Sequence, residues 1–378
     1  MRFTNCFSNP FCSPSRASLL TGRYPYKNGL KEVLFDVRAQ ANTYLHTDQP
    51  SFARQLKQAG YATCISGKWH VSFLFNHNTI NDFGFDQYQV WQIFRNDSSK
   101  TRRYHTPYFN MNGTILADEI KDKYGPDVNL NFLIDFIKFN ASKKRPFLAW
   151  YATPLPHFPW EPTPDSKDQN YTLPGDDHKG NPKYFPDMVS YLDKQIGLIM
   201  KTLKDLKIEE NTVLIFLADN GTDRDLVNNL ANGKSIAGGK GTMTDRGTHV
   251  PLIVRWPNHI KKGTVCDNLI DFSDFLPTLC SFARAPLPTD IINGRSFLPL
   301  LLGKPGNPRE WVHVQDKEAR HLRNGEYILN NKNELRPVVE MWDDPAKPNQ
   351  NTYPEKEQVA RKTLQGVFDS LGVDINKK

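Results

Sequence analysis

Alternation between helical and strand-like apolar patterns is the feature that most restricts how this chain can fold. Apolar residues between Met188 and Leu206 recur at mostly helical spacing, and a short connection leads to the fully apolar run 213–218. Similar runs of strand length occupy residues 61–65, 146–152 and 251–256. Strands that alternate with helices predict an α/β fold with a mostly parallel central sheet flanked by helices.

A change in composition indicates a second structural unit. Residues 303–308 are rich in glycine and proline, as linkers are, and the chain beyond them is more polar. It carries a short strand pattern at 326–329 and a helical pattern at 355–371. We therefore expect a large domain over residues 1–305 and a smaller C-terminal α+β subdomain over residues 306–378. No apolar run approaches the roughly 18–20 residues of a membrane-spanning helix, so no membrane span is expected.

Charge and cysteine content narrow the possible partners. The net charge of +7 and pI near 9.0 favour anionic partners such as sulfated glycans, nucleic acid or acidic lipid. The basic residues are scattered and form no dense block, which argues against a nucleic-acid partner. The five cysteines show no CxxC metal spacing. Their odd number leaves at least one unpaired or chemically special, and a local disulfide between Cys6 and Cys12 is one alternative.

Polar side chains follow three of the predicted strands at the point where each strand ends. Lys68 and His70 follow the first strand, and His157 follows the second. Asp219 and Asn220 follow the apolar run 213–218. Each motif alone is weak, since a lone histidine is more often a packing residue and Asp-Asn-Gly is an ordinary turn. Ligands of open α/β sheets gather beyond the carboxyl ends of the strands, so the convergence of all three predicts a site there.

Two longer motifs are more specific. Residues 12–23, CSPSRASLLTGR, resemble the signature C-x-P-S-R-x-x-x-L-T-G-R of the type I, formylglycine-dependent sulfatases. Residues 60–70, GYATCISGKWH, resemble the second signature of that family. Three further segments are similar to the family's metal-binding strand end, its lysine-bearing loop and the strand that follows, namely 217–221, 238–242 and 247–257. The resemblance implies an alkaline-phosphatase-like fold and a sulfatase catalytic domain over residues 1–305.

The resemblance also implies a modified nucleophile and a metal. In the family, the signature cysteine, here Cys12, is oxidised by a maturation enzyme to formylglycine. The hydrated aldehyde attacks the sulfur of a sulfate ester through one hydroxyl, and loss of a proton from the other later releases sulfate. Arg16 would pair with the formylglycine oxygens. Calcium would bind through oxygen ligands from Asp219, Asn220 and the residue derived from Cys12.

The remaining matched residues receive catalytic roles from the same resemblance. Lys68 and Lys240 would stabilise the negative charge that develops in the transition state. His157 is the candidate acid that protonates the leaving alcohol, and His70 is the candidate base for sulfate release. Histidine suits either task because its pKa lies near neutrality.

The beginning of the chain departs from the family pattern. Family members carry a strand that ends in paired metal-binding aspartates some tens of residues before the signature cysteine. Here only 11 residues precede Cys12, and they contain no acidic pair. We therefore expect an N-terminally truncated member that lacks this strand and exposes a sheet edge. The family is usually exported, which implies an exported protein, although no signal peptide is visible.

The sequence predicts hydrolysis of sulfate esters, on a sulfated carbohydrate or an aryl sulfate, with release of inorganic sulfate. Two alternatives stay open: hydrolysis of phosphonates or phosphodiesters with the same nucleophile, and a metal-deficient, inactive homologue that binds sulfated glycans. Basic and aromatic loops at 91–95 and 102–105 are candidates for holding a sugar ring and its anionic groups, or are ordinary surface.

Overall fold

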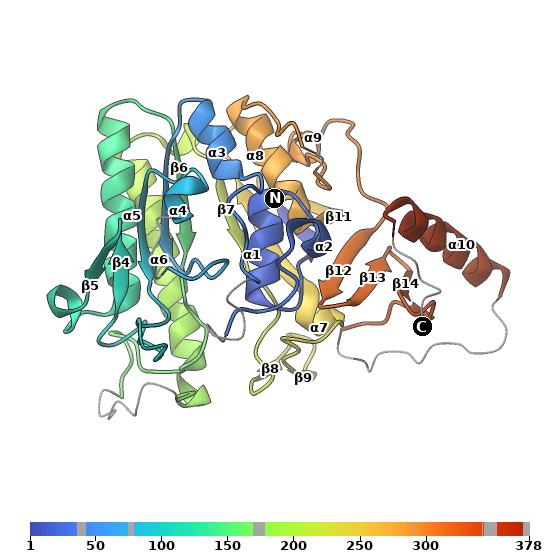
Figure 1. Ribbon diagram of the computed structural model, residues 1–378, viewed down its shortest axis with the longest axis horizontal. Coiled ribbons are helices and arrows are strands. Elements are labelled where there is room, and N and C mark those ends of the chain that lie inside the picture. Colours follow the sequence, from blue (N-terminus) through green and yellow to red (C-terminus); the bar gives the residue numbers. More distant parts are fainter. Residues whose placement is uncertain are drawn as a thin grey trace.

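The computed structural model describes residues 1–35, 43–74, 79–168, 178–290, 292–341, 343 and 354–372. The α/β class expected from the sequence is confirmed, with a C-terminal sheet and helix at one end of the molecule (Figure 1). None of the helices in the described part of the chain has the length and apolarity that crossing a membrane requires.

Two sheets form the larger domain. The first has the strand order β11 (Val265–Asp271), β1 (Arg2–Phe7), β10 (His249–Arg255) and β7 (Leu214–Leu217). The second has the order β5 (Thr114–Leu116), β4 (Phe109–Met111), β3 (Gln87–Trp91), β2 (Ala62–Gly67) and β6 (Phe147–Ala152). A hairpin of β8 (Val227–Asn229) and β9 (Ser235–Ala237) lies in the chain between β7 and β10. The apolar runs of the sequence thus became β2, β6, β7 and β10.

The strand pairing is more mixed than the mostly parallel sheet expected from the sequence. β2 is parallel to β3 and β6, and β1 is parallel to β11. β10, however, is antiparallel to both of its neighbours. β4 and β5 are antiparallel because a tight turn joins them at Asn112 and Gly113, where φ is 50° and 92°. Parallel pairing of β2 with β6 is the part that matters for the site, since it brings their carboxyl ends to one edge.

β6 and β7 each end a sheet. The apolar side chains of residues 147–151 and 214–217 are only half buried. An edge strand presents backbone N–H and C=O groups that no neighbouring strand pairs. β6 and β7 are therefore edge strands within the described part of the chain.

Helices cover the sheets and enclose the core. α5 (Gly125–Ser142) packs on β2 and β6, and α6 (Phe185–Asp205) packs on α5. α3 (Phe52–Gln58) packs on β2 and on α8 (Phe275–Ala283), and both contact α1 (Cys12–Thr21). The short elements are α2 (Pro25–Asn28), α4 (Thr79–Asp82), α7 (Asp245–Thr248), α9 (Leu298–Leu301), η1 (Asp118–Ile120), η2 (Pro182–Tyr184), η3 (Glu209–Asn211) and η4 (Phe272–Asp274).

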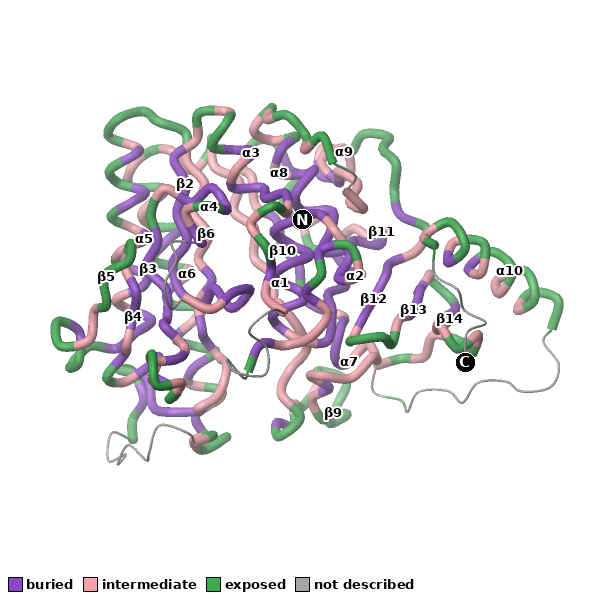
Figure 2. The backbone as a smooth tube through the Cα atoms, in the orientation of Figure 1, coloured by how far each residue is buried: buried purple, intermediate pink, exposed green. Residues whose placement is uncertain are grey.

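α1 lies in the centre of the largest apolar core, and every one of its residues is buried (Figure 2). Leu20 of α1 shares this core with Phe52, Ile65 and Leu276. Burying one such side chain contributes about 1.5–3 kcal/mol, so the core fixes the position of α1 firmly. Whatever chemistry begins at the start of α1 is therefore held on a rigid element.

The C-terminal subdomain is an antiparallel meander of β12 (Val312–Asp316), β13 (Ala319–Arg323), β14 (Tyr327–Asn330) and β15 (Leu335–Pro337). α10 (Glu355–Ser370) packs against it through Leu364 and Phe368 and is otherwise mostly exposed (Figure 2). The strand expected at 326–329 and the helix expected at 355–371 are confirmed. The domain boundary between residues 305 and 306 stays a prediction.

A buried ion pair joins the start of this subdomain to the larger domain. Arg309 donates two hydrogen bonds from Nε and one from Nη2 to the carboxylate of Asp274, at 2.6–2.8 Å. The two side chains are 3% and 2% exposed. Arg309 also donates to the hydroxyl groups of Tyr24 and Ser273.

We predict that Arg309→Met lowers the free energy of unfolding by about 3–5 kcal/mol, because it leaves the Asp274 carboxylate buried without its cation. Urea denaturation followed by circular dichroism measures the change. Lys201→Met is the control, since Lys201 and Asp205 form a surface pair, 68% and 58% exposed, expected to contribute no more than about 0.5 kcal/mol. Equal losses in the two variants would contradict the prediction.

Candidate active site

Cys12 occupies the first position of α1 and is 3% exposed. All five cysteines are free, so no disulfide joins Cys6 to Cys12. Asn9 braces this end of the helix, because its side chain donates to Ser18 Oγ at 3.2 Å and its carbonyl oxygen accepts from Ser15 Oγ at 2.9 Å. The first N–H groups of a helix lack intrahelical partners and carry partial positive charge, which stabilises an anion at this position.

Lys68 and His70 follow the end of β2, and their side chains contact Cys12. Lys68 Nζ lies 3.3 Å from Cys12 Sγ, and His70 Nδ1 lies 3.2 Å from the same atom. The turn out of β2 requires glycine, because Gly67 has φ of 113° and a Cβ there would lie 2.1 Å from the carbonyl oxygen of Ala152. That oxygen accepts a hydrogen bond from the Lys68 backbone N–H at 2.7 Å. The second sequence motif, residues 60–70, thus contacts the first residue of the motif at 12–23.

The electrostatic surroundings of Cys12 favour an anion. Burial alone would raise the pKa of the thiol, but Lys68, His70 and Lys240 together outweigh it and hold the pKa well below its ordinary value. Burial lowers the pKa of Lys68 to about 8, with further lowering by Arg16 and Lys240 and a compensating rise from Cys12. A buried lysine with this environment is stabilised when an anion binds beside it.

Arg16 and Asp219 form the one ion pair found among the predicted site residues. Arg16 Nε and Nη2 lie 2.9 and 2.8 Å from Asp219 Oδ2, and Nη1 donates to the carbonyl oxygen of Lys68 at 2.7 Å. Burial would raise the pKa of Asp219, but Arg16, Lys68 and Lys240 together lower it. Asp219 therefore stays ionised at neutral pH.

Lys240 lies in the loop after β9, and its charge acts on Cys12. Its backbone N–H donates to the carbonyl oxygen of Thr222 at 2.9 Å, and the N–H of Gly241 donates to that of Pro10 at 2.9 Å. Gly241 has φ of 78°, and a Cβ there would lie 2.6 Å from the ring of Phe11, next to Cys12. In the described part of the chain, no carboxylate lies within 4.0 Å of the ammonium group of Lys68 or Lys240.

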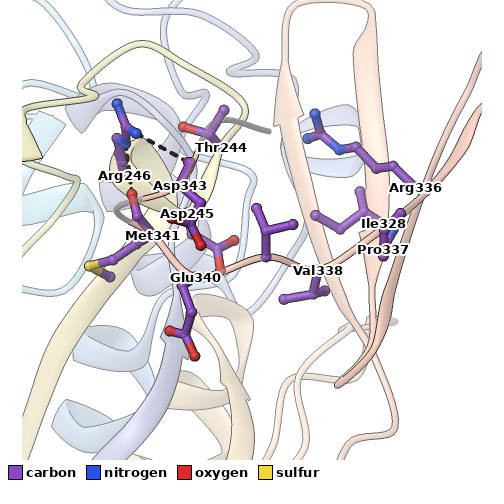
Figure 3. A pocket seen from close by; sticks show the side chains of 11 residues that line it. Thr244, Asp245, Arg246, Ile328, Arg336, Pro337, Val338, Glu340, Met341 and Asp343 are labelled. Carbon is purple, nitrogen blue, oxygen red and sulfur yellow. Dashed lines mark hydrogen bonds between the residues drawn. The ribbon is translucent and has the colours of Figure 1, made fainter. Parts of the chain in front are cut away.

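The chain that follows Lys240 is held by the C-terminal subdomain. Asp245 of α7 pairs with Arg323 of β13 at 3.0 Å, with both side chains largely buried. Arg246 donates to the carbonyl oxygens of Met341 and Asp343 at 2.7 and 3.1 Å, as the dashed lines in Figure 3 show. The pocket drawn in Figure 3 lies between these segments, and none of the predicted site residues lines it.

The two predicted histidines have defined tautomers. A carbonyl oxygen only accepts, so His70 donates from Nε2 to the carbonyl oxygen of Leu34 and turns the Nδ1 lone pair toward Cys12. His157, in the loop after β6, donates from Nδ1 to the carbonyl oxygen of Phe158 at 2.7 Å. Burial lowers the pKa of both rings, helped by Lys68 at His70 and by Lys240, Lys68 and Arg103 at His157. Both rings are neutral at pH 7.

Asp219 and Asn220, directly after β7, carry side-chain oxygens of the kind that a hard cation binds. Asn220 donates from Nδ2 to the carbonyl oxygen of Gly221 at 2.9 Å, while its Oδ1 is fully buried and has no partner. The carboxylate of Asp219 lies beside it in the sequence. Calcium takes six to eight oxygen ligands, and the described residues contain no metal-binding group of three or more His, Cys, Asp or Glu side chains. The fit to calcium is therefore partial.

The structure thus brings all eight predicted site residues around the start of α1. Sequence reasoning named the loop 102–105 as a candidate for holding a sugar ring and its anionic groups, or as ordinary surface, but gave Arg103 no role of its own. Arg103 is 8% exposed and its charge lowers the pKa of His157. No local pattern marks it, because its surroundings come from β3 and from the loop after β6. His313 and His321 are each 3% exposed within the C-terminal sheet, so neither is a surface residue.

Comparisons with known proteins find relatives of this chain. A family model described as Sulfatase matches residues 1–285. The N-acetylgalactosamine-6-sulfatase of Canis lupus familiaris is 30% identical over 357 residues, which cover 86% of this chain and 64% of that protein. Arylsulfatase A of Bos taurus is 28% identical over 333 residues, covering 82% of this chain and 62% of that protein. The chain therefore spans less than two thirds of the length of either relative.

The fold has solved counterparts. The crystal structure of Ps i-CgsB superimposes with a TM-score of 0.78 and covers 100% of this chain and 85% of that chain. Sequence identity between the two is 20%, so the likeness concerns the fold alone.

We predict that Lys68→Met raises the pKa of the unmodified Cys12 thiol by at least about one pH unit, because it removes the nearest buried cation. The ultraviolet absorbance of the thiolate, measured against pH with Cys12→Ser as the blank, reports the midpoint. Lys57→Met is the control, since Lys57 pairs with Asp86 at the surface. An unchanged midpoint in Lys68→Met would show that Lys68 does not act on Cys12.

Proposed function

The chain belongs to the sulfatase family, and on this premise we propose that it hydrolyses sulfate esters with residue 12 as the nucleophile, after oxidation of Cys12 to formylglycine. One observation carries the proposal. The charges of Lys68 and Lys240 act on Cys12. Arg16 donates to the carbonyl oxygen of Lys68, and its partner Asp219 supplies the one carboxylate found in this group among the described residues. A buried excess of positive charge of this kind suits a tetrahedral anion.

The substrate class follows from the same excess charge and from the relatives. One relative is named for N-acetylgalactosamine 6-sulfate and another for aryl sulfates. The net charge of +7 favours an anionic substrate. We therefore propose a sulfated carbohydrate or an aryl sulfate as substrate, an exported location, and a formylglycine-generating enzyme as maturation partner.

Lys68 and Lys240 would bind the sulfate oxygens. Neither ammonium group has a carboxylate within 4.0 Å among the described residues, so both are available to a ligand. Arg16 is held by Asp219 and by the carbonyl oxygen of Lys68, which fixes its guanidinium beside residue 12. Formylglycine supplies a hydrated aldehyde that attacks sulfur and afterwards lets sulfate leave.

His70 would accept the proton that must leave residue 12. Its Nε2–H is committed to the carbonyl oxygen of Leu34, which leaves the Nδ1 lone pair 3.2 Å from the Cys12 side chain. Burial and Lys68 keep this ring neutral, and a neutral ring is the form that acts as a base.

His157 would protonate the departing alcohol. Its Nδ1–H is committed to the carbonyl oxygen of Phe158, so Nε2 is the atom free to carry a transferable proton. Lys240, Lys68 and Arg103 keep its pKa low. A bound anionic ester offsets these charges and raises the pKa, so that His157 gains its proton when substrate is present.

Asp219 and Asn220 would hold calcium, whose chemistry in this setting is to polarise the bound sulfate. The unpartnered Asn220 Oδ1 supports this assignment, and the pairing of Asp219 with Arg16 shows that the same carboxylate also serves a cation of the protein. The described residues supply only part of the usual coordination.

We predict that protein co-expressed with a formylglycine-generating enzyme carries an aldehyde at position 12 and releases sulfate from an aryl sulfate. Cys12→Ala should lose activity by at least about a thousandfold, because the nucleophile is gone. Cys266→Ala is the control, since Cys266 lies in β11 and is only half buried. Mass spectrometry of the Cys12 peptide and a sulfate-release assay supply the two measurements.

Retained activity in Cys12→Ala would contradict the proposal. Faster cleavage of an aryl phosphodiester than of the aryl sulfate would favour the phosphodiesterase alternative. A protein with the aldehyde that binds sulfated glycans without releasing sulfate would favour the metal-deficient, inactive homologue.

A further inference from the structure

Arg103 is a buried cation near the reaction centre that the proposed chemistry involves only through its charge on His157. It lies in the loop between β3 and β4 and is 8% exposed. Its guanidinium carbon lies 4.0 Å from the ring centroid of Trp91, 5.8 Å from that of Tyr104 and 6.0 Å from that of Phe158. Aromatic faces of this kind attract a cation without neutralising its charge.

The loop that carries Arg103 is fixed on both sides. Trp91 Nε1 donates to Thr101 Oγ1 at 2.7 Å, and the hydroxyl oxygen of Tyr104 lies 2.6 Å from the carbonyl oxygen of His157. A Cβ at Gly125 would lie 1.9 Å from the carbonyl oxygen of Arg103, so α5 begins in direct contact with the loop. Arg103 is thus positioned before any ligand arrives.

The guanidinium of Arg103 has no direct ion-pair partner among the described residues. In the described part of the chain, no carboxylate lies within 4.0 Å of its guanidinium, and it makes no hydrogen bond there. Glu161, whose charge acts on Arg103, instead pairs with His178 at 3.0 Å. The fully buried polar atoms without a partner include none from Arg103, so its guanidinium still reaches solvent. A buried, unpaired cation is costly unless a ligand supplies the anion.

Two observations tie Arg103 to the reaction centre. The charge of Arg103 lowers the pKa of His157, and the charge of Cys12 raises the pKa of Arg103. Trp91, on which Arg103 lies, also lines one pocket together with His70. Phe158, whose ring centroid lies 6.0 Å from the guanidinium carbon, directly follows His157, so Arg103 lies beside the candidate acid.

We propose that Arg103 binds a second anionic group of the substrate, a carboxylate or another sulfate, next to the ester that is cleaved. The substrate would then be a polyanionic glycan rather than a simple aryl sulfate. This inference rests on the proposed function and specifies its substrate class. A planar guanidinium held over the Trp91 ring presents its N–H groups in the fork that matches a carboxylate or sulfate.

Binding and turnover by Arg103→Met test the proposal with two matched pairs of sugars. The first pair is glucosamine 6-sulfate and glucosamine 2-N,6-O-disulfate, which differ by one sulfate. The second pair is a uronate-containing 6-sulfated disaccharide and its carboxyl-reduced form, which differ by one carboxylate. Calorimetry on protein carrying Cys12→Ser measures affinity without turnover, and KM and kcat are measured on the matured protein.

We expect Arg103→Met to weaken binding of the dianionic member of at least one pair by at least about tenfold, because a charge-assisted hydrogen bond is lost. Binding of the monoanionic members should change less than about twofold, and any change in kcat through His157 should be the same for both members of a pair. Which pair responds identifies sulfate or carboxylate as the recognised group. Arg103→Lys should restore part of the affinity, since it keeps the charge but not the fork.

Arg95→Met is the matched control, because Arg95 lies over the ring of Tyr108 at 5.0 Å further along the same loop. Equal losses for monoanionic and dianionic sugars, or no preference for either dianionic sugar before mutation, would overturn the proposal. If no sulfate is released by any protein but the binding difference persists, the proposed function fails and this inference stands.

Discussion

Positive charge that the protein does not neutralise, buried around the first turn of α1, is the constraint on which the rest of the site depends. Lys68 and Lys240 point at Cys12 without carboxylate partners in the described residues, and Arg16 alone is paired, with Asp219. Like charges that are buried close together repel each other, because the surrounding medium has a low dielectric constant. Such an arrangement persists only when the surrounding fold holds it and when an anion is the intended occupant.

The fold supplies that support through backbone contacts that tolerate no side chain. Gly67 lets β2 turn against Ala152, and Gly241 lets the Lys240 loop pass the ring of Phe11. The C-terminal subdomain adds a brace from outside, because the Gln315 N–H donates to Asn9 Oδ1 at 3.0 Å, and Asn9 in turn holds α1. The second sheet, the first sheet and the subdomain thus meet at one helix terminus, which explains why α1 is buried throughout.

Much of this arrangement could be predicted from the sequence, and the limits have physical causes. The runs that became β2, β6, β7 and β10 are long and apolar, so their existence was clear. Strand direction was not, since β10 pairs antiparallel through contacts that no periodicity encodes. The catalytic candidates followed from motifs at strand ends. The partners of Arg16 and Arg103 could not be predicted in this way. Asp219 is 203 positions from Arg16, and the rings around Arg103 belong to three separate segments.

The most direct test of the account is a crystal structure of the Cys12→Ser protein with a bound sulfate ester. The account predicts that the sulfate lies at the start of α1, with its oxygens within hydrogen-bond distance of Lys68 Nζ and Lys240 Nζ and with the ester oxygen facing His157. Sulfate bound elsewhere, with Lys68 and Lys240 turned away to carboxylates of the protein, would contradict the claim that their charge is reserved for the substrate.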